Sequence, residues 1–154
     1  MGGDCCAAPA PGVTASVDLC PANGAVGALV SFATLAAQIR GELPEPQELR
    51  VCTSADCAVV YFGSHGAVLR IDDLWQAPGF KSGGSDLVCY CFRKTRGDLA
   101  KDLRRHGESR LFDWIKGRVA DRGCACEIRN PTGRCCLADV RNEIDALRAA
   151  APPP

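Results

Sequence analysis

Eleven of the 154 residues are cysteines, and no other feature constrains the fold of this chain as strongly. Cysteines at such density serve disulfide formation, metal binding or redox catalysis. An odd number fits a closed set of disulfides poorly, and residues 1–12 contain neither the basic nor the apolar region of an export signal. We therefore expect a cytoplasmic protein whose reduced thiols bind metal.

Charge and hydropathy exclude several other classes of protein. The chain has 18 basic and 18 acidic side chains, and this balance argues against nucleic-acid binding. The most apolar run, residues 25–37, is too short to cross a bilayer, so we expect no membrane insertion. The sequence contains no Ser-His-Asp set, phosphate-binding loop or paired-carboxylate motif, so we do not expect an enzyme.

The composition along the chain predicts two modules. Residues 1–19 are rich in Ala, Pro and Gly and are expected to form a flexible arm. A first module over residues 20–73 and a second over residues 87–150 are joined by residues 74–86, a segment rich in Gly and Pro that we interpret as a linker.

The predicted fold class is α+β. In the first module we expect a short helix over residues 29–42 and a β-hairpin whose strands are residues 58–62 and 67–71. The second module has the pattern of three helices, with Thr95 and Ser109 as N-caps and glycine stops. These helices are predicted from Arg96 to about His106, from Ser109 to the stop at Gly123, and from about Leu137 to Ala149.

Six cysteines of the second module form two groups along the chain. Cys89 and Cys91 share one short loop, and such a pair cannot complete a four-coordinate site alone. The other ligands must come from residues 124–136, after the helical hairpin. Cys136 begins the last helix, where free N–H groups and the positive end of the dipole lower the pKa of a thiol. Four thiolates suit a structural zinc ion or an iron–sulfur cluster.

The second module also carries a family resemblance. Residues 88–91, the helical hairpin and residues 126–136 (a cysteine, three residues, then Asn-Pro-Thr-Gly-Arg-Cys-Cys) resemble the [2Fe-2S] domain of bacterioferritin-associated ferredoxins, in the version found in CopZ-type copper chaperones. The resemblance favours an iron–sulfur cluster over zinc. It implies as cluster ligands Cys89, Cys91, Cys126 and Cys136. Cys124 and Cys135 are extra thiols that compete with Cys126 and Cys136, respectively.

The first module is similar to another part of the CopZ-type proteins. Residues 52–62 (CTSADCAVVYF) match the Cys-x4-Cys element that precedes a hairpin in that family. Residues 20–21 match the first half of an upstream Cys-Pro-x-Cys element, but Asn23 occupies the place of its second cysteine. The resemblance thus implies a zinc ion on Cys20, Cys52 and Cys57.

The fourth zinc ligand is open at this point. We favour Cys6, or else Cys5, because the amide of Asn23 is a poor zinc ligand beside thiolates. His65 and water are further alternatives. An empty, degenerate site is the remaining interpretation, since a closed structural zinc site needs four good ligands.

The resemblance, which spans roughly residues 20–140, implies a role in copper homeostasis. CopZ-type proteins reduce copper to Cu+ and deliver it to a copper-transporting ATPase. We do not expect this chain to contain their heavy-metal-associated domain with its Met-x-Cys-x-x-Cys loop, so a separate copper carrier or redox partner is implied, or Cu+ on the spare thiols. The alternatives are a general electron-transfer or cluster-scaffold module and a structural zinc-binding interaction protein.

Overall fold

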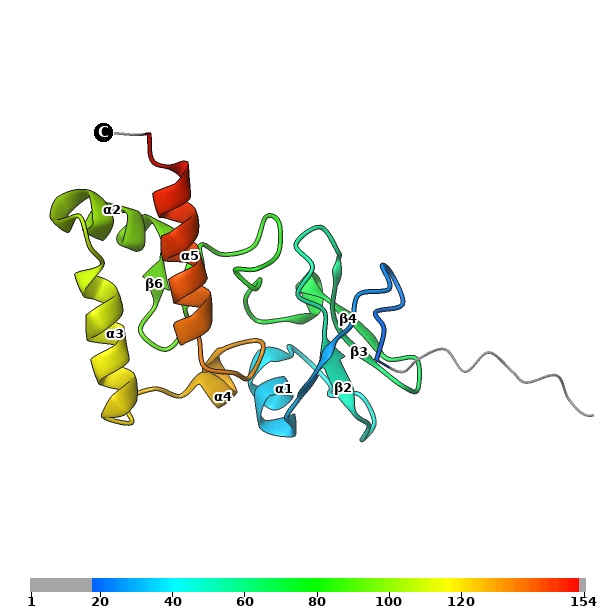
Figure 1. Cartoon of the computed structure of the whole chain (residues 1–154). Helices are drawn as coiled ribbons and strands as arrows, with labels where there is room; N and C mark the ends of the chain where they lie inside the picture. Colours follow the sequence, from blue (N-terminus) through cyan, green and yellow to red (C-terminus); the bar gives the residue numbers. More distant parts are fainter. Residues whose placement is uncertain (1–17, 153–154) are drawn as a thin grey trace, which may run out of the picture.

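The computed structural model describes residues 18–152 and has an α+β fold (Figure 1). Its first half contains a four-stranded antiparallel sheet in the order β1-β2-β3-β4. The strands are β1 (Ala28–Val30), β2 (Leu49–Val51), β3 (Val59–Gly63) and β4 (Val68–Arg70). The predicted hairpin is confirmed as β3 and β4, with Gly66 in its turn at a φ of 81° that glycine adopts readily.

The helix predicted over residues 29–42 is wrong at its beginning and end. Residues 28–30 form β1, which pairs with β2 in a register that places Leu29 opposite Arg50. The helix α1 (Phe32–Gln38) begins after Ser31, whose side chain accepts a hydrogen bond from the Thr34 backbone N–H at 3.2 Å. The local pattern was misleading because it does not show that these residues pair with a distant strand.

One apolar core lies between α1 and the sheet. Leu35 and Ile39 pack against buried residues of β2 and β3, namely Leu49, Val51, Val60 and Tyr61. After β4, the short 3-10 helix η1 (Ile71–Asp73) brings Leu74 into the same core. The sheet and α1 therefore form a packed scaffold from which the loops between the strands project.

The second half is mainly helical. Thr95, the predicted N-cap, forms a capping box with Asp98 at the start of α2 (Arg96–His106), and Gly107 ends that helix at a φ of 74°. The helix α3 (Arg110–Ala120), the second of the three predicted helices, ends three residues before the predicted stop at Gly123. The elements are β5 (Leu87–Cys89), β6 (Lys94–Thr95), α2 (Arg96–His106), α3 (Arg110–Ala120), α4 (Cys126–Arg129) and α5 (Leu137–Ala150).

The core of the second half combines aliphatic side chains with cysteines. Leu99 of α2 and Ile115 of α3 are fully buried and pack with Val140 and Ile144 of α5. The same buried cluster includes Cys89, Cys91, Cys126 and Cys136. The helices therefore enclose the four thiols instead of leaving them on a surface loop.

The two halves contact each other through α1 and α4 (Figure 1). Side chains of α1 donate hydrogen bonds to backbone carbonyls of α4: Thr34 Oγ1 to Glu127 O, and Gln38 Nε2 to Ile128 O at 2.9 Å. A second contact joins the sheet to the following loop, since the Tyr61 hydroxyl donates to Pro131 O at 2.6 Å. These bonds satisfy carbonyls that the short helix α4 and its loop cannot pair internally.

Candidate metal centres

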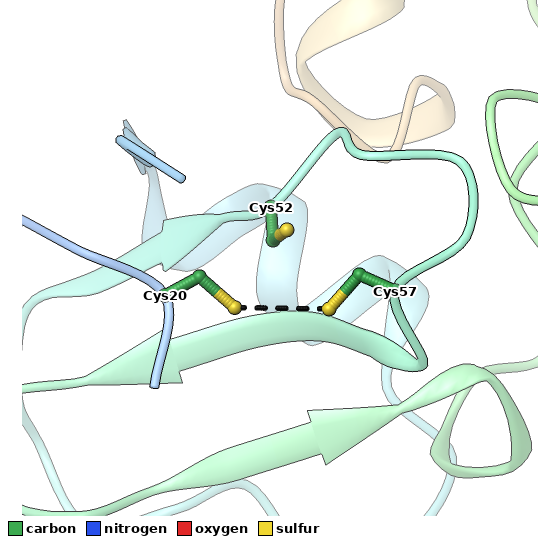
Figure 2. Close-up of side chains that lie close together, drawn as sticks. All are labelled: Cys20, Cys52 and Cys57. Atoms are coloured by element: carbon green, nitrogen blue, oxygen red, sulfur yellow. Dashed lines mark hydrogen bonds between the residues drawn. The ribbon is translucent and has the colours of Figure 1, made fainter. Parts of the chain in front are cut away.

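Three cysteines of the first half meet in one buried group. Cys20, Cys52 and Cys57 have their Sγ atoms within 4.8 Å of one another, and Figure 2 shows the three side chains directed toward a common point. The Sγ atoms of Cys20 and Cys57 are 3.8 Å apart. Cys52 follows β2 and Cys57 precedes β3, so antiparallel pairing of these strands holds both ends of the Cys-x4-Cys loop.

Backbone hydrogen bonds shape the loops that carry these thiols. The Cys20 N–H donates to Ala25 O at 2.8 Å, and Gly24, at a φ of 71°, donates back to Cys20 O at 2.8 Å. In the second loop the Cys52 N–H donates to Val60 O at 2.8 Å. In the first loop, Gly24 occupies the left-handed position that glycine adopts readily.

The environment affects the ionisation of two of these thiols in opposite directions. Burial raises the pKa of Cys20, despite backbone hydrogen bonds from Ala22 and Asn23 that lower it. For Cys52 burial acts in the same upward direction, but hydrogen bonds from Ser54 and Cys20 together with the charge of Lys81 lower its pKa overall. Cys52 is therefore the easier of the two to convert to the thiolate that binds metal.

Within the described residues, no fourth thiol joins this group. Asn23 lies near it, with Oδ1 at 3.9 Å from Cys52 Sγ, but that oxygen already accepts a hydrogen bond from the Ala25 N–H at 3.0 Å. His65 lies in the β3–β4 turn and is not part of the group. Cys5 and the favoured Cys6 lie outside the described residues, so the prediction for them stays a prediction.

The four cysteines implied for a cluster form a second group. They come from four places: Cys89 ends β5, Cys91 follows in the next turn, Cys126 begins α4, and Cys136 is the N-cap of α5. They lie in two pairs, with Sγ–Sγ distances of 3.2 Å for Cys89 and Cys136 and 3.4 Å for Cys91 and Cys126. All four are buried, with exposed fractions of at most 9%.

The extra thiols are placed differently. Cys124 is half-buried and Cys135 is exposed, whereas their competitors Cys126 and Cys136 are buried and paired with the Cys-x-Cys thiols. Ala125, which lies between Cys124 and Cys126 in the sequence, donates its backbone N–H to Cys91 Sγ at 3.1 Å. A hydrogen bond of this type stabilises a thiolate. As candidate metal ligands, Cys126 and Cys136 are therefore favoured over Cys124 and Cys135 by their burial and their contacts with other thiols.

The four thiols share protons unequally. Hydrogen bonding to Cys136 lowers the pKa of Cys126 to about 5 and that of Cys89 to about 7. Burial raises the pKa of Cys91 to about 12. The pKa of Cys136 is raised by its contacts with the thiols of Cys126 and Cys89, of which Cys89 accepts its hydrogen bond, and this outweighs the lowering expected from the start of α5. Cys126 is therefore the thiol of this group that converts most readily to the thiolate that binds metal.

Compactness distinguishes the two groups of thiols. Sulfurs bound to one tetrahedral zinc ion at about 2.3 Å lie about 3.8 Å apart, so all four must be mutually close. Across residues 18–152, only Cys20, Cys52 and Cys57 form a group of three or more potential ligands within 4.8 Å of one another. The second group contains two close Sγ–Sγ contacts, Cys89–Cys136 and Cys91–Cys126, and does not form such a compact group.

The loop between Cys126 and Cys136 is organised by a buried asparagine. Asn130 is 1% exposed; its Nδ2 donates to Arg134 O at 2.7 Å and its Oδ1 accepts from the Thr132 N–H at 3.0 Å. Gly133 adopts a φ of 69° and approaches Thr34 of α1 so closely that a Cβ would lie 2.6 Å from Thr34 Oγ1. These contacts explain why the Asn-Pro-Thr-Gly sequence stands at this point.

Several supporting residues were not anticipated from the sequence. Thr34, Gln38 and Tyr61 hold the α4 region from outside, and Lys81 is buried beside the Cys52–Cys57 loop. No local pattern marks them, because each acts on a segment far away in the chain. In the described part of the chain no helix is long and apolar enough to cross a membrane.

Comparisons with known proteins agree with this geometry. Residues 17–75 match the family zf_CopZ, described as a zinc binding domain. The copper chaperone CopZ of Archaeoglobus fulgidus is 35% identical over 86 residues, which are 55% of this chain and 40% of that protein. The chain therefore spans less than half of the length of this relative.

A solved structure extends the likeness. The X-ray structure of the Archaeoglobus fulgidus CopZ N-terminal domain superimposes with a TM-score of 0.65 and 27% identity, covering 80% of this chain and 95% of that one. This coverage is larger than residues 17–75, so the shared fold continues into the second half. Residues 17–75 are therefore similar to the CopZ zinc-binding domain, within a fold similar to that of the CopZ N-terminal domain.

Proposed function

We propose that this chain is a cytoplasmic metallochaperone or electron-transfer protein of copper homeostasis, with zinc on Cys20, Cys52 and Cys57 and a [2Fe-2S] cluster on a second thiol group. The cluster ligands are Cys89, Cys91, Cys126 and Cys136. The observation that carries the proposal is the presence of two separate buried thiol groups, one compact and one divided into two pairs. The match to a CopZ zinc-binding domain supports the first site.

The residues around the second group suit a redox centre. When bound, a [2Fe-2S] cluster takes up and releases one electron. The chain contributes four buried sulfurs, a backbone N–H from Ala125 to Cys91 Sγ, and an apolar enclosure by Leu99, Ile115 and Val140 that limits access of water. Hydrogen bonding to sulfur and solvent exclusion are two of the means by which a protein adjusts the potential of such a cluster.

The copper role rests on the resemblance and on the spare thiols. Cys135 is exposed and Cys124 half-buried, and soft thiolates of this kind are suitable ligands for Cu+. The relative from Archaeoglobus fulgidus is named a copper chaperone. We propose that Cu+ reaches this chain from a separate copper carrier, or that one electron from the reduced cluster converts Cu2+ to Cu+, and that the Cu+ then passes to a copper-transporting ATPase.

Analysis of anaerobically purified protein tests the two sites. We expect a red-brown protein with about two irons and two acid-labile sulfides per chain and a rhombic EPR signal after one-electron reduction. A colourless protein with zinc but no sulfide would leave only a structural zinc protein. If the cluster is present but copper has no effect on its reduction or reoxidation, the general electron-transfer alternative replaces the copper role.

Two variants give a matched comparison for the cluster ligands. Cys91→Ser removes a buried, paired thiol and should bleach the protein, whereas Cys124→Ser removes a neighbouring unassigned thiol and should keep the colour. A fully coloured Cys91→Ser protein would show that Cys91 is not a cluster ligand. A bleached Cys124→Ser protein would show that Cys124, in place of Cys126, is a cluster ligand. The visible spectrum and the iron content measure both outcomes.

A further inference from the structure

Within the described part of the chain, Lys81 is a buried cation without an acidic partner. It is 3% exposed, and its Nζ donates hydrogen bonds to Val59 O at 2.6 Å and to Ser54 O at 2.9 Å. Within residues 18–152, the ion pairs involve Arg50, Arg96 and His106, and none involves Lys81. Removing an ammonium group from water without a counter-charge is strongly unfavourable, so a nearby source of negative charge is required.

The neighbours of Lys81 identify this source. Ser54 lies inside the Cys52–Cys57 loop, and Val59 follows it at the start of β3. Ser82, the residue after Lys81, is hydrogen-bonded to the same loop, since its N–H donates to Ala55 O at 2.9 Å. The loop that carries Lys81 is therefore anchored on the loop that carries two of the three clustered thiols.

With three thiolate ligands, the charges of the site balance when Lys81 is included. Three thiolates and one divalent cation leave one net negative charge inside the protein. Building on the zinc site proposed above, we propose that Lys81 is the fixed counter-charge of that site, a positioning residue whose ammonium neutralises the excess charge of the thiolate–metal complex without touching the ion. If a fourth thiolate binds, the complex of thiolates and metal carries two negative charges, and Lys81 reduces this excess to one.

The two hydrogen bonds of Lys81 hold its ammonium group against both ends of the Cys52–Cys57 loop region, at Ser54 O and Val59 O. The carbonyl acceptors of Lys81 orient the ammonium group but carry only partial charge, so they do not replace an anion. The interaction therefore strengthens when metal converts the three thiols to thiolates.

Three substitutions separate charge from packing. Lys81→Arg keeps the charge, Lys81→Gln keeps a hydrogen-bond donor without charge, and Lys81→Met keeps most of the apolar stem only. We expect Gln and Met to lower zinc affinity about tenfold or more, and Arg to stay within about threefold of the wild type. The control Lys101→Met removes an exposed lysine of α2 and should not change zinc affinity. Competition with a chromophoric chelator measures each affinity.

The zinc-free background gives an independent test. In Cys57→Ser protein, which lacks one of the three thiols, adding Lys81→Met should lower the melting temperature less than it does in the zinc-loaded wild type. Equal losses in both backgrounds, or wild-type zinc affinity in Lys81→Gln, would show that Lys81 acts by packing and would overturn the proposal. A wild-type protein that binds no zinc would instead overturn the zinc site itself.

Discussion

The hydroxyl of Tyr61 offers a sensitive test of how the two halves are joined. Tyr61 lies on β3 and is 0% exposed, and its hydroxyl donates to Pro131 O at 2.6 Å, inside the loop that leads to Cys136. Pro131 is itself fully buried, so water cannot replace the lost donor without opening the structure. Tyr61→Phe removes one oxygen atom and leaves that carbonyl without a partner.

The expected magnitude follows from this burial. An unsatisfied buried acceptor costs about 1–3 kcal/mol, so the substitution should lower the free energy of unfolding by that amount. With a urea m-value of about 2 kcal/mol/M, the midpoint falls by about 0.5–1.5 M. If local opening of the loop precedes cluster release, the same free energy raises the rate of cluster loss about 5- to 150-fold.

Two assays read the prediction for Tyr61→Phe. Urea unfolding followed by far-UV circular dichroism gives the midpoint, and bleaching after addition of an iron chelator under argon gives the rate of cluster loss. The control Ser82→Ala removes an exposed hydrogen bond to Asp56 and should change the stability by no more than about 0.5 kcal/mol. A Tyr61→Phe protein with wild-type midpoint and wild-type bleaching rate would show that the buried contact between β3 and the 130–136 loop does not form.

Three further predictions concern single residues. Gly133→Ala should destabilise the protein by about 2 kcal/mol or more in thermal unfolding, because Gly133 has a positive φ and lies close to Thr34. The control Gly117→Ala in α3, with open space around it, should be neutral or slightly stabilising. Equal effects of the two substitutions would contradict the loop geometry. Cys57→Ser should lose zinc and keep its visible spectrum, because its sulfur belongs to the first thiol group only; loss of colour would contradict separate sites. Cys6→Ser should weaken zinc binding in chelator competition, and unchanged affinity would exclude Cys6 as the fourth ligand.

The elements that were predicted well are those that local chemistry determines. The helix α2 begins at a capping box and ends at a left-handed glycine, and both signals lie within one turn of the helix they limit. The strands β1 and β2 were missed, because each is three residues long and is stable only when paired with the other and with β3. The same dependence on a partner explains why a helix was expected where β1 begins.

The candidate sites show the same contrast between residues that the sequence indicates and residues that only the fold reveals. Spacing and family resemblance pointed to seven cysteines that the fold indeed brings into two groups. The sequence could not show that Lys81 is buried, since a lysine in a Gly-rich segment has the pattern of a surface residue. Its burial depends on the close approach of residues 78–85 to the Cys52–Cys57 loop, a contact that no periodicity records.

The loop that ends at Cys136 shows how local and distant residues combine in one site. Asn130 shapes the loop through bonds to its own neighbours, so the motif is visible in the sequence. Yet the carbonyls of α4 and of Pro131 are satisfied by Thr34, Gln38 and Tyr61, which belong to the other half of the chain. A fragment that began after residue 86 would keep the motif and expose these carbonyls to water, where they lose their fixed donors. The position of Cys126 and Cys136 relative to Cys89 and Cys91 therefore depends on the zinc-binding half as well as on the motif that contains them.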